Sequence, residues 1–181
     1  MTDQELEKLR FPIGNFTTSE NLDAVPINNL ISTLQFFPAK IKLEVISLND
    51  EQIDTPYRPG GWTIRQVVHH VADSHMNAMI RFKLTLTEES PIVKPYPEQL
   101  FAELVDSKFL PIDSSLKILD GVHERLTVLL RNVTSADFAR EYVHPQYGKR
   151  FRLDTAVALY AWHCEHHLAH ITQLKKRMSW K

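Results

Sequence analysis

The chain has 181 residues, a formal net charge of −1 and a pI near 6.8, and 43% of its residues are hydrophobic. This balance excludes the basic surface expected of a nucleic-acid or anionic-membrane binder, and it excludes a disordered chain. The length predicts a single domain over residues 1–181. No apolar run approaches the roughly 20 residues that cross a bilayer. Together with one cysteine, Cys164, and a polar start, these features favour a cytoplasmic protein.

Apolar residues recur mostly three and four positions apart, and only five glycines occur, which predicts a helical protein. Residues 1–25 are predicted to be an irregular lead-in. A first helix is predicted over residues 26–45, with a kink or break at Pro38 because proline cannot continue the backbone hydrogen-bond ladder. A Thr-x-x-Gln capping box opens a second helix over residues 63–88.

The second half of the chain predicts two more helices. Residues 89–111 carry four prolines and are predicted to form a long connection. A third helix is predicted over residues 113–130, a small β-hairpin or extended loop within 138–153, and a fourth helix over 154–178. Four principal helices in one domain predict an all-α antiparallel four-helix bundle, whose core is a common place for a metal site.

The predicted fourth helix contains four histidines within eight residues, between His163 and His170. Neutral imidazole is the commonest protein ligand for divalent transition metals. His163 and His167 lie one helical turn apart on the same face, near the apolar stripe of this helix, so they can converge on one ion. Two ligands from one turn rarely complete a metal site. A third ligand is therefore expected from elsewhere in the chain.

The second helix supplies the candidates for that third ligand. His69 is predicted to point away from the core, and His70 is modestly favoured over His75 because it lies in a polar stripe that borders the apolar face. This stripe contains Thr63, Gln66, His70, Ser74, Asn77 and Arg81. Polar groups bordering a core suggest a lined cavity, and Gln66, Ser74, Asn77 and Arg81 are the pocket candidates.

The other histidines and the cysteine have simpler interpretations. His75 and His123 are expected to be core histidines bonded to backbone groups. His166 and His170 are expected to be partly solvated or to contact a ligand histidine from behind. Cys164 lies within the apolar stripe and is expected to be an inert buried thiol.

Known catalytic motifs narrow the chemistry. A zincin needs H-E-x-x-H, but Cys164 follows the first histidine here, and the chain has no zinc-deaminase P-C-x-x-C motif and no nucleophile elbow. Asp73 and Glu165 could act as bases, although Glu165 is expected to be a solvated charge. Three histidines leave open positions on an ion, which points to catalysis or sensing and away from a closed structural site.

The block Asp54–Asn77, which contains G-G-W-T-I-R-Q-V-V-H-H, closely resembles the YfiT branch of the DinB superfamily. The segments F-P-I-G, I-R-F-K-L and L-Y-A-W-H through His170 also resemble it. The resemblance implies a four-helix bundle, commonly a homodimer, with one divalent metal per subunit. By position it assigns the ligands to His70, His163 and His167. It further implies a metal-dependent hydrolase or a bacillithiol-type S-transferase.

The expected function is therefore a metal-dependent enzyme in which Zn²⁺ or Ni²⁺ activates a nucleophile for reaction with a small-molecule substrate. The nucleophile is either water or a low-molecular-weight thiol, because a bound cation lowers the pKa of both. The lack of an evident glutamate base mildly favours the thiol. The alternative is a non-catalytic bundle that binds or senses a metal or small molecule. No nucleic-acid or membrane partner is expected.

Overall fold

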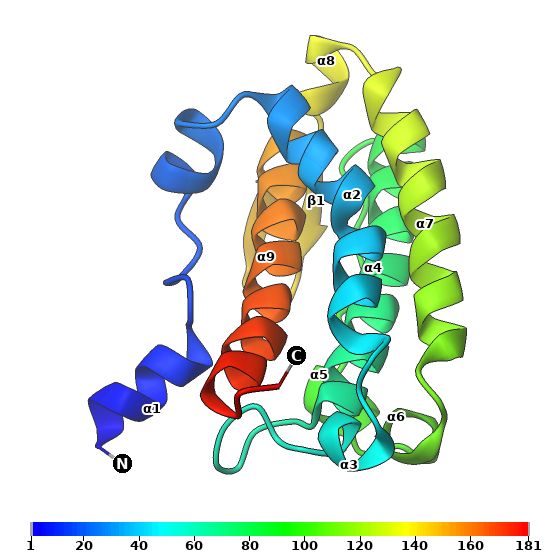
Figure 1. The fold of residues 1–181 in the computed structure, drawn as a ribbon. Helices are drawn as coiled ribbons and strands as arrows, with labels where there is room; N and C mark the ends of the chain where they lie inside the picture. Colours follow the sequence, from blue (N-terminus) through cyan, green and yellow to red (C-terminus); the bar gives the residue numbers. More distant parts are fainter. Residues whose placement is uncertain (1, 181) are drawn as a thin grey trace.

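The computed structural model describes residues 2–180, the side chain of Ser19 excepted. Four long helices form a bundle, as predicted (Figure 1). They are α2 (Ile27–Val45), α4 (Ile64–Thr87), α7 (Asp113–Arg131) and α9 (Leu153–Arg177). Within the described residues, no helix combines the length and the hydropathy needed to cross a membrane.

The order of the helices around the bundle is not the order of the chain. Both α2 and α4 pack against α7 and α9, so α2 and α4 occupy opposite corners. In Figure 1, α2 and α9 run downward, whereas α4 and α7 run upward. The pairs α2/α7 and α4/α9 are antiparallel, as expected, but α2/α9 and α4/α7 are parallel. The cause is the long connection 88–112, which returns the chain to the level where α4 began before α7 starts.

Short helices lie at the two ends of the bundle, and two short strands lie beside α4 and α9. They are α3 (Asp50–Ile53), α5 (Glu98–Phe101), α6 (Val105–Phe109), α8 (Ser135–Phe138), β1 (Glu141–His144) and β2 (Lys149–Arg152). The two strands pair antiparallel with Glu141 opposite Arg152, so the predicted hairpin within residues 138–153 is confirmed. The backbone of Val143 bonds to both Pro91 and Val93, which ties the long connection to β1 beside α4.

The prediction of an irregular lead-in over residues 1–25 is wrong for residues 3–10 and 19–23, which are helical, and residue 1 lies outside the described residues. Helix α1 (Asp3–Arg10) is capped by a reciprocal Thr2–Glu5 box, and a π-helical turn, η1 (Ser19–Asp23), follows it. No residue of α1 is buried, so no apolar periodicity signals it in the sequence. Figure 1 shows this segment lying along the outer side of the bundle, beside α9.

The predicted break at Pro38 does not occur, because α2 continues through it. Pro38 lacks the N–H that would bond to the Leu34 carbonyl within the helix. That carbonyl instead accepts a hydrogen bond from Nδ1 of His123 on α7. Leu34, Phe37 and Ile41 are fully buried around this point, so packing against α7 and α9 holds the helix together.

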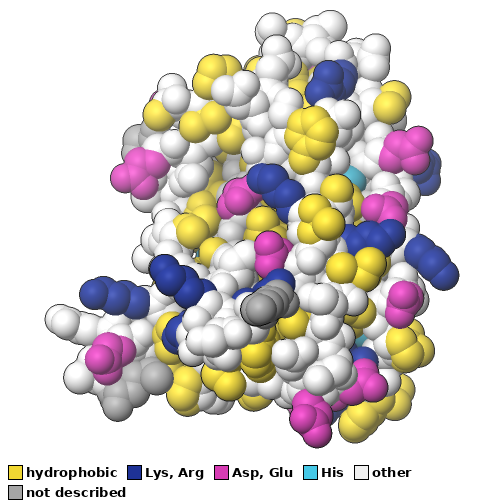
Figure 2. Space-filling model, viewed as in Figure 1, with side chains coloured by type: hydrophobic (Ala, Val, Ile, Leu, Met, Phe, Trp, Pro, Cys, Tyr) yellow, Lys and Arg dark blue, Asp and Glu magenta, His cyan; other side chains and the backbone are white. Residues whose placement is uncertain are grey.

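The outer surface carries charges of both signs. On the face shown in Figure 2, acidic and basic side chains are interspersed with apolar ones, and almost no histidine is visible. Eight of the nine histidines are at most 7% exposed, and only His163 is more exposed. The eight are His69, His70, His75, His123, His144, His166, His167 and His170. The histidines therefore point into the bundle.

Candidate metal centre and its cleft

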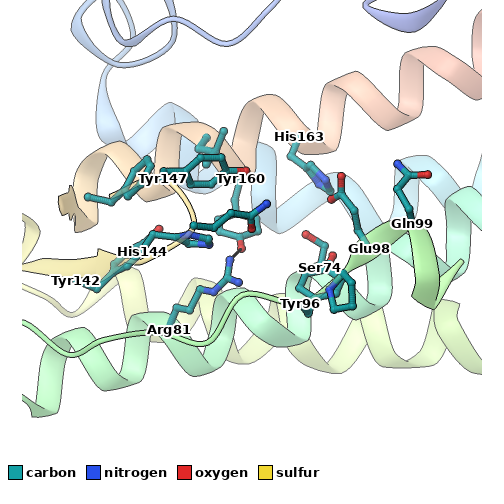
Figure 3. Close-up of a pocket in the computed structure, with 14 residues that line it drawn as sticks. Ser74, Arg81, Tyr96, Glu98, Gln99, Tyr142, His144, Tyr147, Tyr160 and His163 are labelled. Atoms are coloured by element: carbon teal, nitrogen blue, oxygen red, sulfur yellow. Dashed lines mark hydrogen bonds between the residues drawn. The ribbon is translucent and has the colours of Figure 1, made fainter. Parts of the chain in front are cut away.

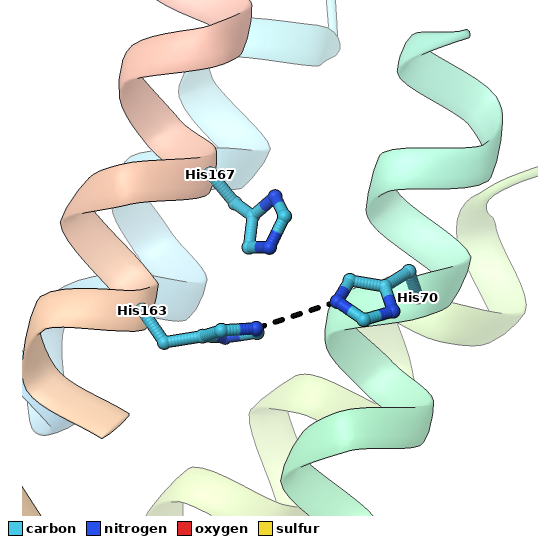
Figure 4. Close-up of side chains that lie close together, drawn as sticks. All are labelled: His70, His163 and His167. Carbon is cyan, nitrogen blue, oxygen red and sulfur yellow. Dashed lines mark hydrogen bonds between the residues drawn. The ribbon is translucent and has the colours of Figure 1, made fainter. Parts of the chain in front are cut away.

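Three histidines converge between α4 and α9. His163 and His167 project from successive turns of α9, and His70 projects from α4 (Figure 4). Nε2 of His70 lies 3.3 Å from Nε2 of His163, and the ligand atoms of the three rings lie within 4.8 Å of one another. This is the set that helical spacing and the family resemblance named. The structure brings the three rings together, and their role as metal ligands stays a prediction.

Burial keeps these three rings neutral. Burial, and to a smaller extent the nearby His166, lowers the pKa of His70 to about 4. Burial also holds the pKa values of His163 and His167 well below the ordinary value, and the neighbouring imidazoles add to the effect. A neutral ring offers a nitrogen lone pair, which a protonated ring lacks. Three lone pairs are therefore available at neutral pH.

A chain of hydrogen bonds leads from His163 into the core. Its Nδ1 lies 3.1 Å from Nε2 of His75, and Nδ1 of His75 lies 2.7 Å from Nε2 of His123. His123 in turn bonds through Nδ1 to the Leu34 carbonyl. A carbonyl oxygen only accepts, so His123 must carry its proton on Nδ1. In neutral rings, His75 and His163 must then also donate from Nδ1, which leaves the lone pair of His163 on Nε2.

A second, shorter chain fixes His167. Nε2 of His170 lies 3.1 Å from the carbonyl of Arg10, the last residue of α1, where helix carbonyls lack a backbone donor. Nδ1 of His170 lies 3.3 Å from Nδ1 of His167. Because His170 must donate from Nε2, its Nδ1 accepts, and His167 donates from Nδ1. The lone pair of His167 is therefore on Nε2, and Figure 4 shows this ring turned toward the other two.

These two chains test whether the residues suit a metal ion, and they do. Metal-binding histidines commonly donate their second ring N–H to a carbonyl or another acceptor, which orients the ring and fixes its tautomer. His163 and His167 each have such a partner, and each presents a lone pair on the nitrogen nearest the centre. His70 is held by packing against Trp62, with ring centroids 4.6 Å apart.

In two other clusters the candidate ligand atoms also lie within 4.8 Å of one another, but fewer of their nitrogens are free to bind a metal. In the group His75, His123 and Cys164, both nitrogens of each histidine already take part in hydrogen bonds, and burial raises the pKa of the thiol well above its ordinary value. In the group His166, His167 and His170, both nitrogens of His170 are engaged. The set containing His70 is therefore the best candidate.

The remaining predictions about histidines have mixed outcomes. His75 and His123 are core residues, as expected, and they are 0% and 1% exposed. His170 contacts His167 from behind, as expected. His166 also packs against His167, with ring centroids 5.0 Å apart, and it stacks on Trp162 and is only 7% exposed. His69 is also buried, because it bonds to Ser115 and to the Leu110 carbonyl.

The predicted bases have separate environments. Glu165 pairs with Lys40 at 2.8 Å on the surface, as expected of a solvated charge. Partial burial raises the pKa of Asp73 to about 6, with a further contribution from Asp106. Neither carboxylate lines the two cavities beside the centre.

Two cavities meet at His163. The Arg81 lobe, of about 410 Å³, is lined by residues that include Ser74, Arg81, Tyr142, His144 and Tyr160 (Figure 3). The Trp62 lobe, of about 420 Å³, is lined by residues that include Arg10, Arg58, Trp62, Trp162 and all three histidines of the centre. Both lobes share His163, Glu98, Gln99 and Tyr147. The candidate centre thus opens into a cleft with two compartments.

Two of the four pocket candidates do not line this cleft. The amide of Gln66 caps α4 at Thr63 and donates to the Ala102 carbonyl at 2.8 Å. Asn77 donates to the Asp73 carbonyl in its own helix. Both side chains therefore serve local structure, whereas Ser74 and Arg81 do line the Arg81 lobe.

Glu98 is a candidate functional residue that the sequence did not reveal. It begins α5, lines both lobes, and Figure 3 shows its carboxylate directed toward the ring of His163. Desolvation raises the pKa of this carboxyl above its ordinary value. Its only local signal is a position after Pro97 in a proline-rich connection, which does not predict where the chain folds back.

The fold and the histidine cluster define a four-helix bundle with a candidate metal centre between two of its helices. The chain belongs to the DinB superfamily, whose model matches residues 42–171. The structure of YfiT from Bacillus subtilis is 48% identical, covers 96% of this chain and 99% of its own, and superposes with a TM-score of 0.92. YfiT is described as a probable metal-dependent hydrolase with an unusual four-helix bundle topology.

A second relative supports membership of the superfamily, and a more distant protein shares the fold. A protein of Bacillus cereus strain B4264, described in similar terms, is 48% identical over 97% of this chain and 100% of its own length. A mycothiol-dependent maleylpyruvate isomerase shares the fold, with a TM-score of 0.65, 16% identity, and coverage of 82% of this chain and 62% of its own. This last likeness concerns the fold alone.

Proposed function

We propose that the chain is a metal-dependent hydrolase in which His70, His163 and His167 hold one divalent cation. Three neutral, convergent imidazoles support this, because imidazole donors suit Zn²⁺ and Ni²⁺. Three protein ligands also leave positions open for water and substrate. A bound cation of this kind supplies Lewis acidity, which lowers the pKa of a bound nucleophile and polarises a substrate carbonyl.

The position of Glu98 between the two lobes favours hydrolysis. Hydrolysis requires a base to take a proton from the attacking water and an acid to return one to the leaving group. Glu98 stands at the junction of the two lobes beside His163, and its pKa is raised by desolvation, so it accepts a proton more readily than an ordinary carboxylate. It supplies the base that the sequence alone did not offer, and it removes the reason for preferring a thiol.

Metal content tests the first part of the proposal. Protein without an affinity tag is purified as wild type and as His167→Ala, and bound metal is measured by plasma mass spectrometry. We expect stoichiometric metal in wild type and its loss in the variant. His69→Ala is the matched control, because it removes a buried histidine that bonds only to Ser115 and Leu110. Absence of specific metal after reconstitution with Zn²⁺ and with Ni²⁺ would reject the proposal.

Turnover tests the role of Glu98. The metal-loaded protein is assayed on a panel of esters and amides, and Glu98→Gln is expected to reduce turnover by about 100-fold while metal content is retained. Glu103→Gln is the control, because Glu103 pairs with Lys108 on the surface and lines neither lobe. Full turnover in Glu98→Gln would exclude Glu98 as the base.

Thiol transfer is the second candidate, and the two-lobed cleft favours it. A transferase must hold a thiol and an electrophile together, and the lobes lie on either side of His163. Arg10 and Arg58 in the Trp62 lobe suit an anionic low-molecular-weight thiol. Conjugation of such a thiol to monochlorobimane or an epoxide by metal-loaded protein would support it. Metal binding without turnover in any of these assays would favour a non-catalytic binding protein.

A further inference from the structure

Arg81 is a partly buried cation that meets no carboxylate in the described structure. Its Nη1 donates to the Tyr160 hydroxyl at 3.1 Å and its Nη2 to the Lys94 carbonyl at 3.3 Å, and both acceptors are uncharged. Its Nε is buried without a hydrogen-bond partner, and none of the ion pairs among the described residues includes Arg81. A guanidinium withdrawn from water in part is stabilised by a nearby anion, because desolvation of an unpaired charge is costly.

His144 has a second unpaired polar atom in the same lobe. The residue ends β1 and is 6% exposed, and its Nδ1 is buried without a hydrogen-bond partner in the described part of the chain. Burial, and then the charge of Arg81, lower the pKa of His144, so the two groups are close enough to interact. Figure 3 shows both side chains directed into the space beside Tyr160. Arg81 and His144 line the same lobe, and Arg81 has no carboxylate partner, so an anion in this lobe would supply the counter-charge that the guanidinium lacks.

The walls of the Arg81 lobe restrict what that ligand can be. Tyr142, Tyr147 and Phe151 line it together with Tyr160, so aromatic rings form a large part of its wall. His163 and Glu98 lie at its junction with the other lobe. A ligand that fills the lobe therefore meets cationic and hydrogen-bonding groups at one end, aromatic rings along its body, and the candidate metal centre at the other end.

We propose that the Arg81 lobe binds the carboxylate of a small substrate with an aromatic or apolar body. The carboxylate takes a charge-assisted hydrogen bond from the guanidinium of Arg81 and lies beside His144, while the rest of the molecule extends toward His163. One part of this proposal rests on the proposed function, namely that the bond to be hydrolysed lies near His163. Binding of the carboxylate itself does not depend on catalysis.

The test compares two ligands of nearly the same size and shape, one with a charged and one with a neutral end group. Binding of phenylacetate and of its neutral analogue phenylacetamide is measured by NMR titration of the intact protein, with and without bound Zn²⁺. We expect phenylacetate to bind more tightly, and Arg81→Met to weaken it by about tenfold or more, as loss of a charge-assisted hydrogen bond implies. His144→Phe, which keeps a ring but removes the nitrogens, should weaken it less.

Arg58→Met asks whether the Trp62 lobe binds the anion instead. Arg131→Met is the matched control, because Arg131 donates to Gln35 on the surface and lines neither lobe. It should leave phenylacetate binding unchanged. Equal affinity for acid and amide, or weakening by Arg58→Met and not by Arg81→Met, would overturn the proposal. Equally tight competition by inorganic phosphate would replace the carboxylate specificity with a general anion site and would also overturn it. Carboxylate binding in a protein that takes up no metal would leave this inference standing and reject the proposed function.

Discussion

Replacement of His170 by phenylalanine tests whether the hydrogen-bond chains behind the centre control metal affinity. His170 is 3% exposed and stacks on Tyr57 with ring centroids 3.9 Å apart, and a phenylalanine ring can keep that packing. The change removes only the two ring nitrogens. It leaves Nδ1–H of His167 without an acceptor and the Arg10 carbonyl without its donor.

The expected loss follows from that geometry. Without its acceptor, His167 no longer has a fixed tautomer, and Nε2 can carry the proton instead of the lone pair. Loss of such a supporting group typically costs about 10- to 100-fold in metal affinity, or roughly 1.4–2.7 kcal/mol. The unpaired buried donor should also lower the free energy of unfolding by about 1–3 kcal/mol.

Competition with a chromogenic chelator measures Zn²⁺ affinity, and denaturant unfolding of the metal-free protein measures stability. Nitrogen-15 NMR of the histidine rings should report Nδ1–H for His167 in wild type and a mixture in the variant. His69→Phe should show a similar loss of stability but unchanged affinity, because His69 is 5% exposed and belongs to neither chain. Unchanged affinity in His170→Phe, or an equal loss in His69→Phe, would refute the reasoning. Complete loss of metal would instead make His170 a ligand.

Four further predictions concern stability and assembly. Removal of metal by a chelator should lower the melting temperature, and restored Zn²⁺ should reverse this, because binding stabilises only the folded state; scanning calorimetry measures both. Burial raises the pKa of Asp73 to about 6 from 3.8, so its charged form destabilises the fold increasingly as pH rises through that range. Asp73→Asn should therefore add about 1 kcal/mol at pH 7, allowing for partial exposure, and nothing below pH 3.8, as urea unfolding at both pH values would show. Arg65→Met should cost about 2 kcal/mol in the same assay, because Arg65 bonds to Asp54 at 2.6 Å and to the Leu110 carbonyl. The homodimer that the family resemblance implies should appear in light scattering, and a monomer at all concentrations would contradict it.

The connection over residues 88–112 shows where sequence reasoning stopped. Its prolines predict an extended path, but they do not say which helix the path crosses. The structure folds it back along the bundle, bonds it to β1 through Val143, and brings Glu98 to His163. The candidate base therefore arises from contacts between segments far apart in the chain, which no local pattern encodes.

The helices themselves follow from local chemistry. The capping box at Thr63 and the apolar spacing after it predict α4 correctly, and the i, i+4 spacing places His163 and His167 on one face of α9 whatever the rest of the fold does. These features depend on backbone geometry over one or two turns. A sequence records them directly.

The tautomers of the candidate ligands needed the tertiary structure. They depend on carbonyls of Leu34 and Arg10, which lie in other helices and are free because of Pro38 in one case and a helix end in the other. The sequence by itself determined which residues could bind a metal, because residue type and helical period are local. Only the packing of α1, α2 and α7 around α4 and α9 decided which nitrogen of each ring is free, because a hydrogen bond between distant segments requires the chain to be folded.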